Sequence, residues 1–299
     1  MTYQRTLSAP VDLKGVGLHS GKPVTLRLLP AAVDTGVVFV RTDVTDKNNR
    51  IPARWDSVVD TRLCTVIANS AGVSVGTIEH LMAALRGADV HNVIAELNGA
   101  EVPIMDGSSA DFLAAIAQVG TVAQDTPAFA IKVLSPITVQ EGDKIVCLTP
   151  SSRATYSGDI EFNHPTIGEQ SYTVELLNGN FAHQIAAART FGFFEEVNTL
   201  RSMGLALGGS LDNAIVVDRD GVMNPGGLRF EDEFIRHKLL DAIGDLYLAG
   251  APVIGAYHAH KPSHALNNAL LRALFADRSA WAVVPLGGVA PEMAEIAAV

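Results

Sequence analysis

The sequence predicts an α+β fold in two halves, and the order of the expected elements is the main observation behind this prediction. Each half begins with strand signals and ends with the order helix, strand, helix. Residues 120–127 lack clear periodicity and are the candidate linker between the halves. A chain of 299 residues can form one large domain or two ordinary ones. The matching order suggests a duplicated unit, although no residue-level repeat accompanies it.

The first half shows two strand signals before its first helix. Both are short β-branched or apolar runs with turn residues around them. A helix is expected next, because Gly76 and Thr77 precede apolar residues at helical spacing. In order, the expected elements are strands at 24–28 and 37–40, a helix from Glu79, a strand near 91–97 and a helix from about Ser109.

The second half repeats this order with a longer central helix. The expected elements are strands within 129–140 and at 144–148, the helix that carries His237, a strand within 252–258 and a helix from about His264. The His237 helix reads as amphipathic, with Leu239, Ile243 and Leu246 on the side opposite the histidine. By periodicity alone, residues 191–200 would form a short helix packed in a core.

Composition and charge exclude several classes of protein. Hydrophobic residues make up 48% and charged residues 18%, which favours a folded globular chain over disorder. The net charge of −10 argues against general nucleic-acid binding. Only Cys64 and Cys147 are present, too few for a disulfide framework, so a reducing compartment is expected. The N-terminus has no apolar signal core, and no run reaches the roughly 18 apolar residues of a membrane helix. We therefore expect a soluble cytoplasmic protein that can touch the inner membrane surface.

The helix around His237 carries the first candidate site. His237 and Asp241 are one helical turn apart, and Asp245 follows one turn later on the same stripe. A histidine and a carboxylate in this register can bind a divalent metal ion at two points. The alternative is a solvated helix face, on which Asp245 in particular would be an ordinary exposed carboxylate.

A second helix start, at Glu79 and His80, supplies complementary groups. Adjacent helical residues point about 100° apart, so this pair cannot easily bind one ion together. They can divide the work: His80 binds the metal, and Glu79 faces the attacking water. Two histidines and one carboxylate, with a fourth position left to water, form a standard catalytic zinc set. Alternatively, His80 is a satisfied histidine near a helix start, and Glu79 only complements the helix dipole.

Four motifs in order resemble one enzyme family. They are Thr77-Ile78-Glu79-His80-Leu81, Pro103-Ile104-Met105-Asp106-Gly107-Ser108, Ala188-Arg189-Thr190-Phe191-Gly192-Phe193 and Arg236-His237-Lys238-Leu239-Leu240-Asp241. Together they resemble the UDP-3-O-acyl-N-acetylglucosamine deacetylases, zinc amidases of lipid A synthesis in Gram-negative bacteria. The likeness runs from residues 15–21 to 264–268. It implies two similar α/β sandwich domains, 1–124 and 128–299, with the active site at their junction.

The resemblance implies hydrolysis of the N-acetyl group of a UDP-3-O-(3-hydroxyacyl)-N-acetylglucosamine, the committed step of lipid A biosynthesis. One Zn²⁺ per chain is expected, although the ligand set also admits Fe²⁺. The implied metal ligands are His80, His237 and Asp241. Glu79 is implied as the general base. Thr190 would stabilise the oxyanion, and His264, oriented by Asp245, would protonate the leaving amine.

The same resemblance implies where the substrate binds. Cationic groups near the nucleotide and sugar would be Lys144, Lys238, Lys261 and His19. Phe162 would stack on uracil. An insertion at about 190–212 would enclose the acyl chain, with Phe191, Phe194, Leu200 and Ser210 in it. Taken singly, the lysines would be ordinary solvated side chains and Phe162 a core aromatic. The expected partner is this small UDP-sugar lipid precursor, bound by a monomer without stable membrane insertion.

Other interpretations are weaker. Residues 15–22 look like a phosphate-binding loop, but the glycine interval is one residue too long, and Pro23 stands where Ser or Thr is needed. His258 and His260 alternate along an expected strand, and we expect them on one face near the site rather than in a separate metal cluster. Two functional alternatives are a zinc amidase for another acetylated sugar and a non-catalytic module that binds a nucleotide sugar or acyl chain.

Overall fold

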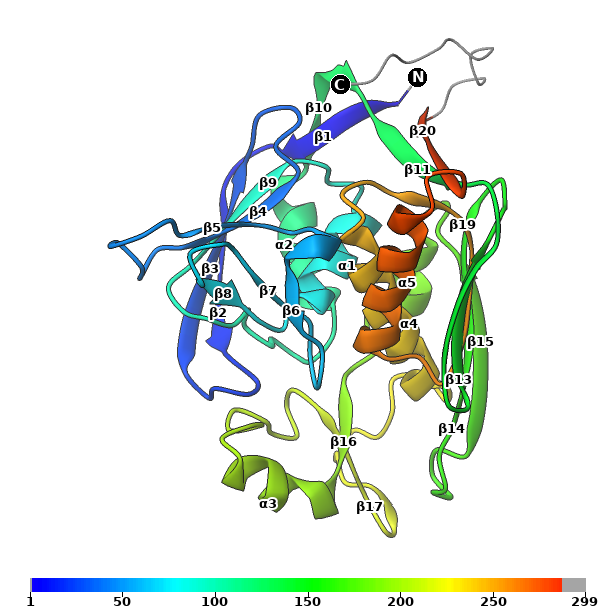
Figure 1. Cartoon of the computed structure of the whole chain (residues 1–299). Helices are drawn as coiled ribbons and strands as arrows, with labels where there is room; N and C mark the ends of the chain where they lie inside the picture. The colour runs from blue at the N-terminus through cyan, green and yellow to red at the C-terminus, as the bar shows by residue number, and fades with distance from the viewer. Residues whose placement is uncertain (1, 287–299) are drawn as a thin grey trace.

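The computed structural model describes residues 2–286 and shows an α+β fold with helices between two sheets (Figure 1). The helices between the sheets are α1 (Glu79–Gly87), α2 (Ala110–Val119), α4 (Glu233–Tyr247) and α5 (His264–Ala276). α1 packs against α4, and α4 packs against α5, so the two halves meet through their helices. The predicted α+β class is confirmed. No helix among the described residues is both long and apolar enough to cross a bilayer.

The sheet of the first half has five strands in the order β2-β3-β9-β4-β5. These are β2 (Val11–Val16), β3 (Pro23–Pro30), β9 (Val93–Leu97), β4 (Val37–Arg41) and β5 (Arg50–Pro52). Side chains on successive residues of a strand point to opposite faces, so one face of this sheet meets the core. In β3, Val24, Leu26 and Leu28 are buried and Arg27 is exposed. A second, small sheet contains β6 (Val58–Asp60), β7 (Val66–Ala68) and β8 (Ser74–Val75), preceded by a 3₁₀ turn at Trp55–Ser57.

The sheet of the second half has seven strands with β19 at its centre. These are β11 (Phe129–Val133), β12 (Ile137–Glu141), β13 (Lys144–Thr149), β14 (Ala154–Glu161), β15 (Glu169–Glu175), β19 (Val253–His260) and β20 (Trp281–Pro285). β19 runs parallel to β11 and β14 and antiparallel to β13. Residues 287–299 of the expected second domain lie outside the described residues.

The candidate linker is a strand. Residues Thr121–Pro127 form β10, which pairs antiparallel with β1 (Tyr3–Leu7) as a separate two-stranded ribbon. No residue of β10 is fully buried, so the strand lacks the alternation by which sequence analysis recognises strands. Its main-chain pairing with the N-terminus therefore decides its conformation.

The insertion differs from the short core helix that periodicity suggested. Its first residues form β16 (Phe191–Phe193), which pairs with β17 (Ile215–Asp218), itself paired with β18 (Gly221–Val222). Helix α3 (Phe194–Ser202) follows β16 and contains no buried residue. In Figure 1, α3 and this small sheet project away from the main layers. Residues 191–200 therefore contain a short helix, but it is not packed in a core: only Phe191 and Phe193, before the helix, pack against core residues.

Helix α4 is buried on nearly every side rather than amphipathic at the surface. Its apolar residues pack in the core, and its polar residues Glu233, His237, Asp241 and Asp245 are buried as well. Gly244 explains the close crossing with α1, because a Cβ there would lie 2.0 Å from the Glu79 carbonyl oxygen. Only glycine allows the two backbones to approach this closely.

Candidate active site and metal centre

Three buried residues from two helices form a metal-binding constellation. His80 comes from the first turn of α1, and His237 and Asp241 lie one turn apart on α4. The Nε2 atoms of the two histidines lie 3.5 and 3.4 Å from the same Oδ1 of Asp241. The structure thus brings together the three residues that the sequence predicted as metal ligands.

The donor set fits a divalent metal ion. Two ligand atoms that each lie about 2.0–2.1 Å from a tetrahedral zinc ion are about 3.4 Å apart, close to the spacing seen here. Oδ1 of Asp241 is buried and has no hydrogen-bond partner among the described residues, which is costly without an ion. Burial lowers the pKa of His237 to about 3, so the ring is neutral, as a metal ligand must be.

His237 is held in the correct tautomer by the main chain. Its Nδ1 lies 3.1 Å from the carbonyl oxygen of Ala188, so Nδ1 carries the proton and the Nε2 lone pair faces Asp241. The Ala188 segment is fixed in turn by a buried ion pair. Arg189 Nε lies 2.9 Å from Glu233, which is fully buried at the first residue of α4.

Glu79 is buried beside the metal constellation. One oxygen, Oε2, accepts a hydrogen bond of 3.0 Å from the Thr65 main-chain N–H. The other, Oε1, lies 3.9 Å from Nε2 of His264. Burial raises the pKa of Glu79, partly offset by the charges of His264 and His80. A buried carboxylate with a raised pKa is a better proton acceptor than one in water, which suits it to take a proton from water.

His264 and Asp245 form a hydrogen-bonded pair beside Glu79. His264 Nδ1 lies 2.8 Å from Asp245 Oδ2, at the start of α5, where Ser263 caps the helix. The carboxylate also accepts hydrogen bonds from the Asn267 amide and the Thr65 hydroxyl. Burial would lower the pKa of His264, but Asp245 outweighs it and raises the value to about 9.

Thr190 lies two residues beyond the carbonyl that orients His237. Its main-chain N–H donates to Gly107, and its carbonyl accepts from Ile215 at the start of β17. Thr190 is half-buried and joins the motif of residues 103–108 to the insertion. The main chain of Thr190 therefore links the Gly107 turn to β17 of the insertion.

Aromatic residues continue from the metal constellation into the insertion. The Phe191 ring lies edge-on to His237, with centroids 6.3 Å apart, and edge-on to Phe162 at 5.8 Å. Lys238 Nζ lies 3.1 Å from Asp241 Oδ2. On α3, Leu200 is half-buried and Phe194 is 53% exposed. Phe191 thus lies between His237 and Phe162, at the strand that leads into the projecting insertion.

The insertion also contacts the loop of His19. Main-chain N–H groups of Leu207 and Gly208 donate to the carbonyls of His19 and Leu18, and Ser210 follows, exposed. Glu101 anchors the same loop by accepting from the His19 N–H at 2.8 Å. Both ring nitrogens of His19 are buried without a partner among residues 2–286, which is unusual for buried polar atoms.

Two lysines predicted to bind the substrate, Lys261 and Lys144, form no ion pair with the site residues described above, within the part of the chain that the structure describes. Lys261 Nζ pairs with Asp143 at 2.7 Å and with Glu161 at 3.0 Å. Lys144 is exposed at the start of β13. Among residues 2–286, neither ammonium group makes an ion pair with a residue of the metal constellation. Lys261 would have to exchange its carboxylate partners for a phosphate to bind one.

His258 and His260 lie on one face of β19, as expected, but this face points away from the helices. On β19 the inward positions are taken by Tyr257 and Ala259, and the Tyr257 hydroxyl donates to Asn267 of α5. His258 is exposed on the other face and contacts Ser157, and His260 pairs there with Asp159. Strand alternation turns both histidines away from the helices.

The structure also places around the site several residues that the sequence analysis did not identify. Thr65, Asn267, Glu101 and the Arg189–Glu233 pair all bond a predicted site residue or its segment. Asn267 and Arg189 fall within motifs of the family resemblance. Thr65 gives no sequence signal, because a buried threonine before a short strand has no distinguishing spacing.

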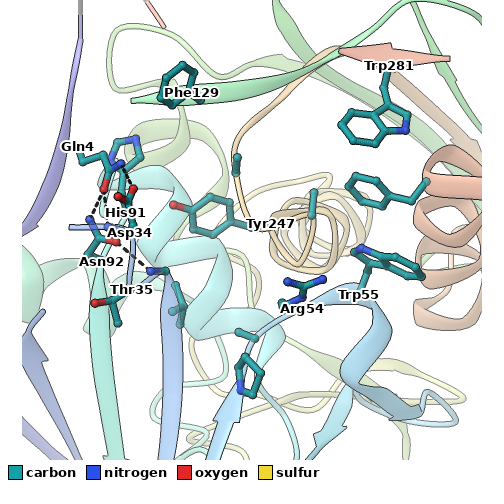
Figure 2. A pocket seen from close by; sticks show the side chains of 18 of the residues that line it. Gln4, Asp34, Thr35, Arg54, Trp55, His91, Asn92, Phe129, Tyr247 and Trp281 are labelled. Carbon is teal, nitrogen blue, oxygen red and sulfur yellow. Dashed lines mark hydrogen bonds between the residues drawn. The ribbon is translucent and has the colours of Figure 1, made fainter. Parts of the chain in front are cut away.

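A cavity of about 590 Å³ lies apart from these groups (Figure 2). It lies beyond the C-terminal end of α4, where Tyr247 and Gly250 line it. Gln4, Asp34 and Asn92 form a hydrogen-bonded wall, and Trp55 and Trp281 lie on the opposite side (Figure 2). None of the predicted site residues lines this cavity.

Comparisons with known proteins identify the family. A family model described as UDP-3-O-acyl N-acetylglycosamine deacetylase (LpxC) matches residues 4–276. A UDP-3-O-acyl-N-acetylglucosamine deacetylase of Myxococcus xanthus is 51% identical over 282 residues, covering 94% of this chain and 89% of the relative. Enzymes of that name from Mannheimia succiniciproducens and Vibrio parahaemolyticus are 48% and 47% identical, covering 95% and 94% of this chain and 93% and 92% of the relatives. The chain therefore belongs to the UDP-3-O-acyl N-acetylglycosamine deacetylase family.

Proposed function

We propose that this chain hydrolyses the N-acetyl group of a UDP-3-O-acyl-N-acetylglucosamine, releasing acetate and the free amine, in lipid A biosynthesis. One observation carries the proposal beyond family membership. Glu79 and the His264–Asp245 pair lie beside the constellation of His80, His237 and Asp241, so a base, an acid and a metal-binding set converge. Amide hydrolysis needs all three functions in one place.

Each protein group has a defined task in this reaction. A divalent ion held by His80, His237 and Asp241 would supply Lewis acidity at the amide carbonyl and lower the pKa of the attacking water. Glu79 takes a proton from that water as its oxygen attacks the acetyl carbon. The Thr190 side chain would contribute to stabilising the negative charge that develops on the carbonyl oxygen.

The leaving nitrogen must be protonated before it departs, because an amide anion is a very poor leaving group. His264 suits this role: its pKa of about 9 keeps the ring protonated at neutral pH. Its Nε2 faces Glu79 while Nδ1 is held by Asp245, so the free N–H points to the reacting side. Transfer of this proton to nitrogen as the C–N bond breaks releases the amine and acetate.

The insertion supports the choice of an acylated substrate. Phe191 lies edge-on to His237 and leads into the insertion, whose helix α3, with Leu200, contains no buried residue. An acyl chain beside these side chains would cover apolar surface that the protein leaves open. We propose that Phe194 and Ser210 belong to this passage, that Phe162 stacks on uracil, and that His19, Lys144, Lys238 and Lys261 offset the diphosphate.

Zinc is the metal we propose, at one ion per chain, with Fe²⁺ as the alternative for the same ligands. We also propose that the chain acts as a cytoplasmic monomer. Its division into domains 1–124 and 128–299 is a further proposal. It is supported by the two main sheets, whose strands come from residues before and after the β10 segment.

The proposed function is tested by acetate release from UDP-3-O-(3-hydroxyacyl)-N-acetylglucosamine, compared with plain UDP-N-acetylglucosamine. Release that a chelator abolishes and limited zinc restores, with strong preference for the acylated substrate, is the expected result. Equal rates on both substrates would instead indicate an amidase for other acetylated sugars. Binding without release under every metal condition would indicate a non-catalytic module.

A further inference from the structure

We propose that Thr65 is a positioning residue that holds the general base and the acid pair of this active site in one fixed arrangement. The inference rests on the proposed function. Thr65 is only 1% exposed and immediately precedes β7, outside every motif of the family resemblance. Both of its hydrogen-bond donors go to carboxylates of the proposed machinery.

The two contacts join distant parts of the chain. The Thr65 main-chain N–H donates to Glu79 Oε2 at 3.0 Å, and the hydroxyl donates to Asp245 Oδ1 at 2.6 Å. Glu79 begins α1, and Asp245 lies near the end of α4. Thr65 therefore bridges the two helices on which the halves of the site are built.

Each contact occupies one oxygen of a carboxylate and leaves the other for the reaction. With Oε2 of Glu79 held, Oε1 faces His264 Nε2 at 3.9 Å. With Oδ1 of Asp245 held by Thr65, Oδ2 accepts from His264 Nδ1. Thr65 thus sets the rotation of both carboxylates, and through Asp245 it sets the direction in which His264 points.

The contacts of Thr65 can be separated by substitution. Thr65→Val keeps the side-chain volume and the main-chain N–H to Glu79 but removes the hydroxyl from Asp245. Thr65→Ser keeps the hydroxyl and removes one methyl group. The pair of variants therefore distinguishes a role of the hydrogen bond from a role in packing.

We expect Thr65→Val to lower kcat by about 10- to 100-fold, the usual worth of a hydrogen bond to a charged group. KM and metal content should stay within about twofold of wild type, because this hydroxyl is buried and bonds Asp245, which is not one of the three residues of the metal constellation. Thr65→Ser should retain kcat within about threefold. These values are measured by acetate release and by metal analysis of the purified holoenzyme.

A double-mutant cycle tests whether the effect passes through Asp245. In an Asp245→Ala background, adding Thr65→Val should change kcat by less than about twofold. A Thr65→Val variant with full kcat, a Thr65→Ser variant as impaired as Thr65→Val, or additive losses in the cycle would each overturn the inference. An inactive wild-type enzyme would overturn the proposed function itself, and this inference with it.

Discussion

His264 Nδ1 lies 2.8 Å from Oδ2 of Asp245, and this contact determines the protonation state of the proposed general acid. Burial of the imidazole opposes its positive charge, but the carboxylate outweighs burial and raises the pKa from 6.5 to about 9. The ring therefore carries its proton across the neutral range. Asp245 is held in turn by Thr65 and Asn267, so its orientation does not depend on His264 alone.

Activity should accordingly fall on the alkaline side, near pH 9, as His264 loses its proton. Asp245→Asn removes the charge that raises this pKa, so the alkaline limb of kcat/KM should move to lower pH. The raised pKa of His264 also stabilises the folded state. This contribution to the free energy of unfolding is fully present below pH 6.5 and is lost as pH rises through about 9. A pH–rate profile of both proteins checks the prediction. An unmoved limb in Asp245→Asn would assign it to another group.

Glu79→Gln should lower kcat by about 10²- to 10⁴-fold, because the amide cannot accept the water proton. The metal should remain, since Glu79 is not among the three proposed ligands. His237→Ala is the contrasting variant and should lose the metal as well as activity. Metal analysis together with acetate release distinguishes the two. Near-normal turnover by Glu79→Gln would show that another group is the base.

Gly244→Ala should separate α1 from α4, because its Cβ would lie 2.0 Å from the Glu79 carbonyl oxygen. We expect a lower melting temperature and weaker metal binding, since His80 and His237 come from these two helices. Gly226→Ala is the matched control, because no heavy atom lies within 4 Å of a Cβ at that position. Equal melting temperatures for the two variants would contradict the predicted clash.

Leu200→Ala should lower kcat/KM for the acylated substrate by about tenfold, the worth of the lost apolar contact. It should leave kcat/KM for plain UDP-N-acetylglucosamine unchanged, because that substrate has no acyl chain. Stability should change little, since α3 contains no buried residue. Met203→Ala, 65% exposed just after α3, is the control. A loss of equal size on both substrates would remove Leu200 from the acyl passage.

Local patterns predicted much of the site because helix geometry has a fixed period. The one-turn spacing of His237, Asp241 and Asp245 placed them on one stripe, and the structure has them there. Burial was harder to predict. The helix pattern suggested a polar face in solvent, whereas α4 is enclosed because α1 and α5 cover that face. Its polar residues are tolerated inside because each meets a specific partner or a metal-binding position.

Segments without a periodic pattern of hydrophobic residues were predicted poorly from the sequence. The β10 segment forms a strand because β1 supplies main-chain partners, and α3 projects because no core faces it. The ion pairs of Lys261 with Asp143 and Glu161 also have no signature in the sequence. Each of these outcomes depends on a partner that is far away along the chain or absent, which local propensity cannot register.

The sequence by itself determined the fold class, the family resemblance and the sets of groups that each helix presents. Only the tertiary structure decided how those sets meet: Gly244 lets α4 approach Glu79, and Thr65 bonds both carboxylates across that junction. The physical reason is the distance along the chain over which each kind of interaction acts. Helical periodicity acts over one or two turns, whereas the contact between Thr65 and Asp245 joins residues 180 positions apart and forms only when the packed helices bring them together.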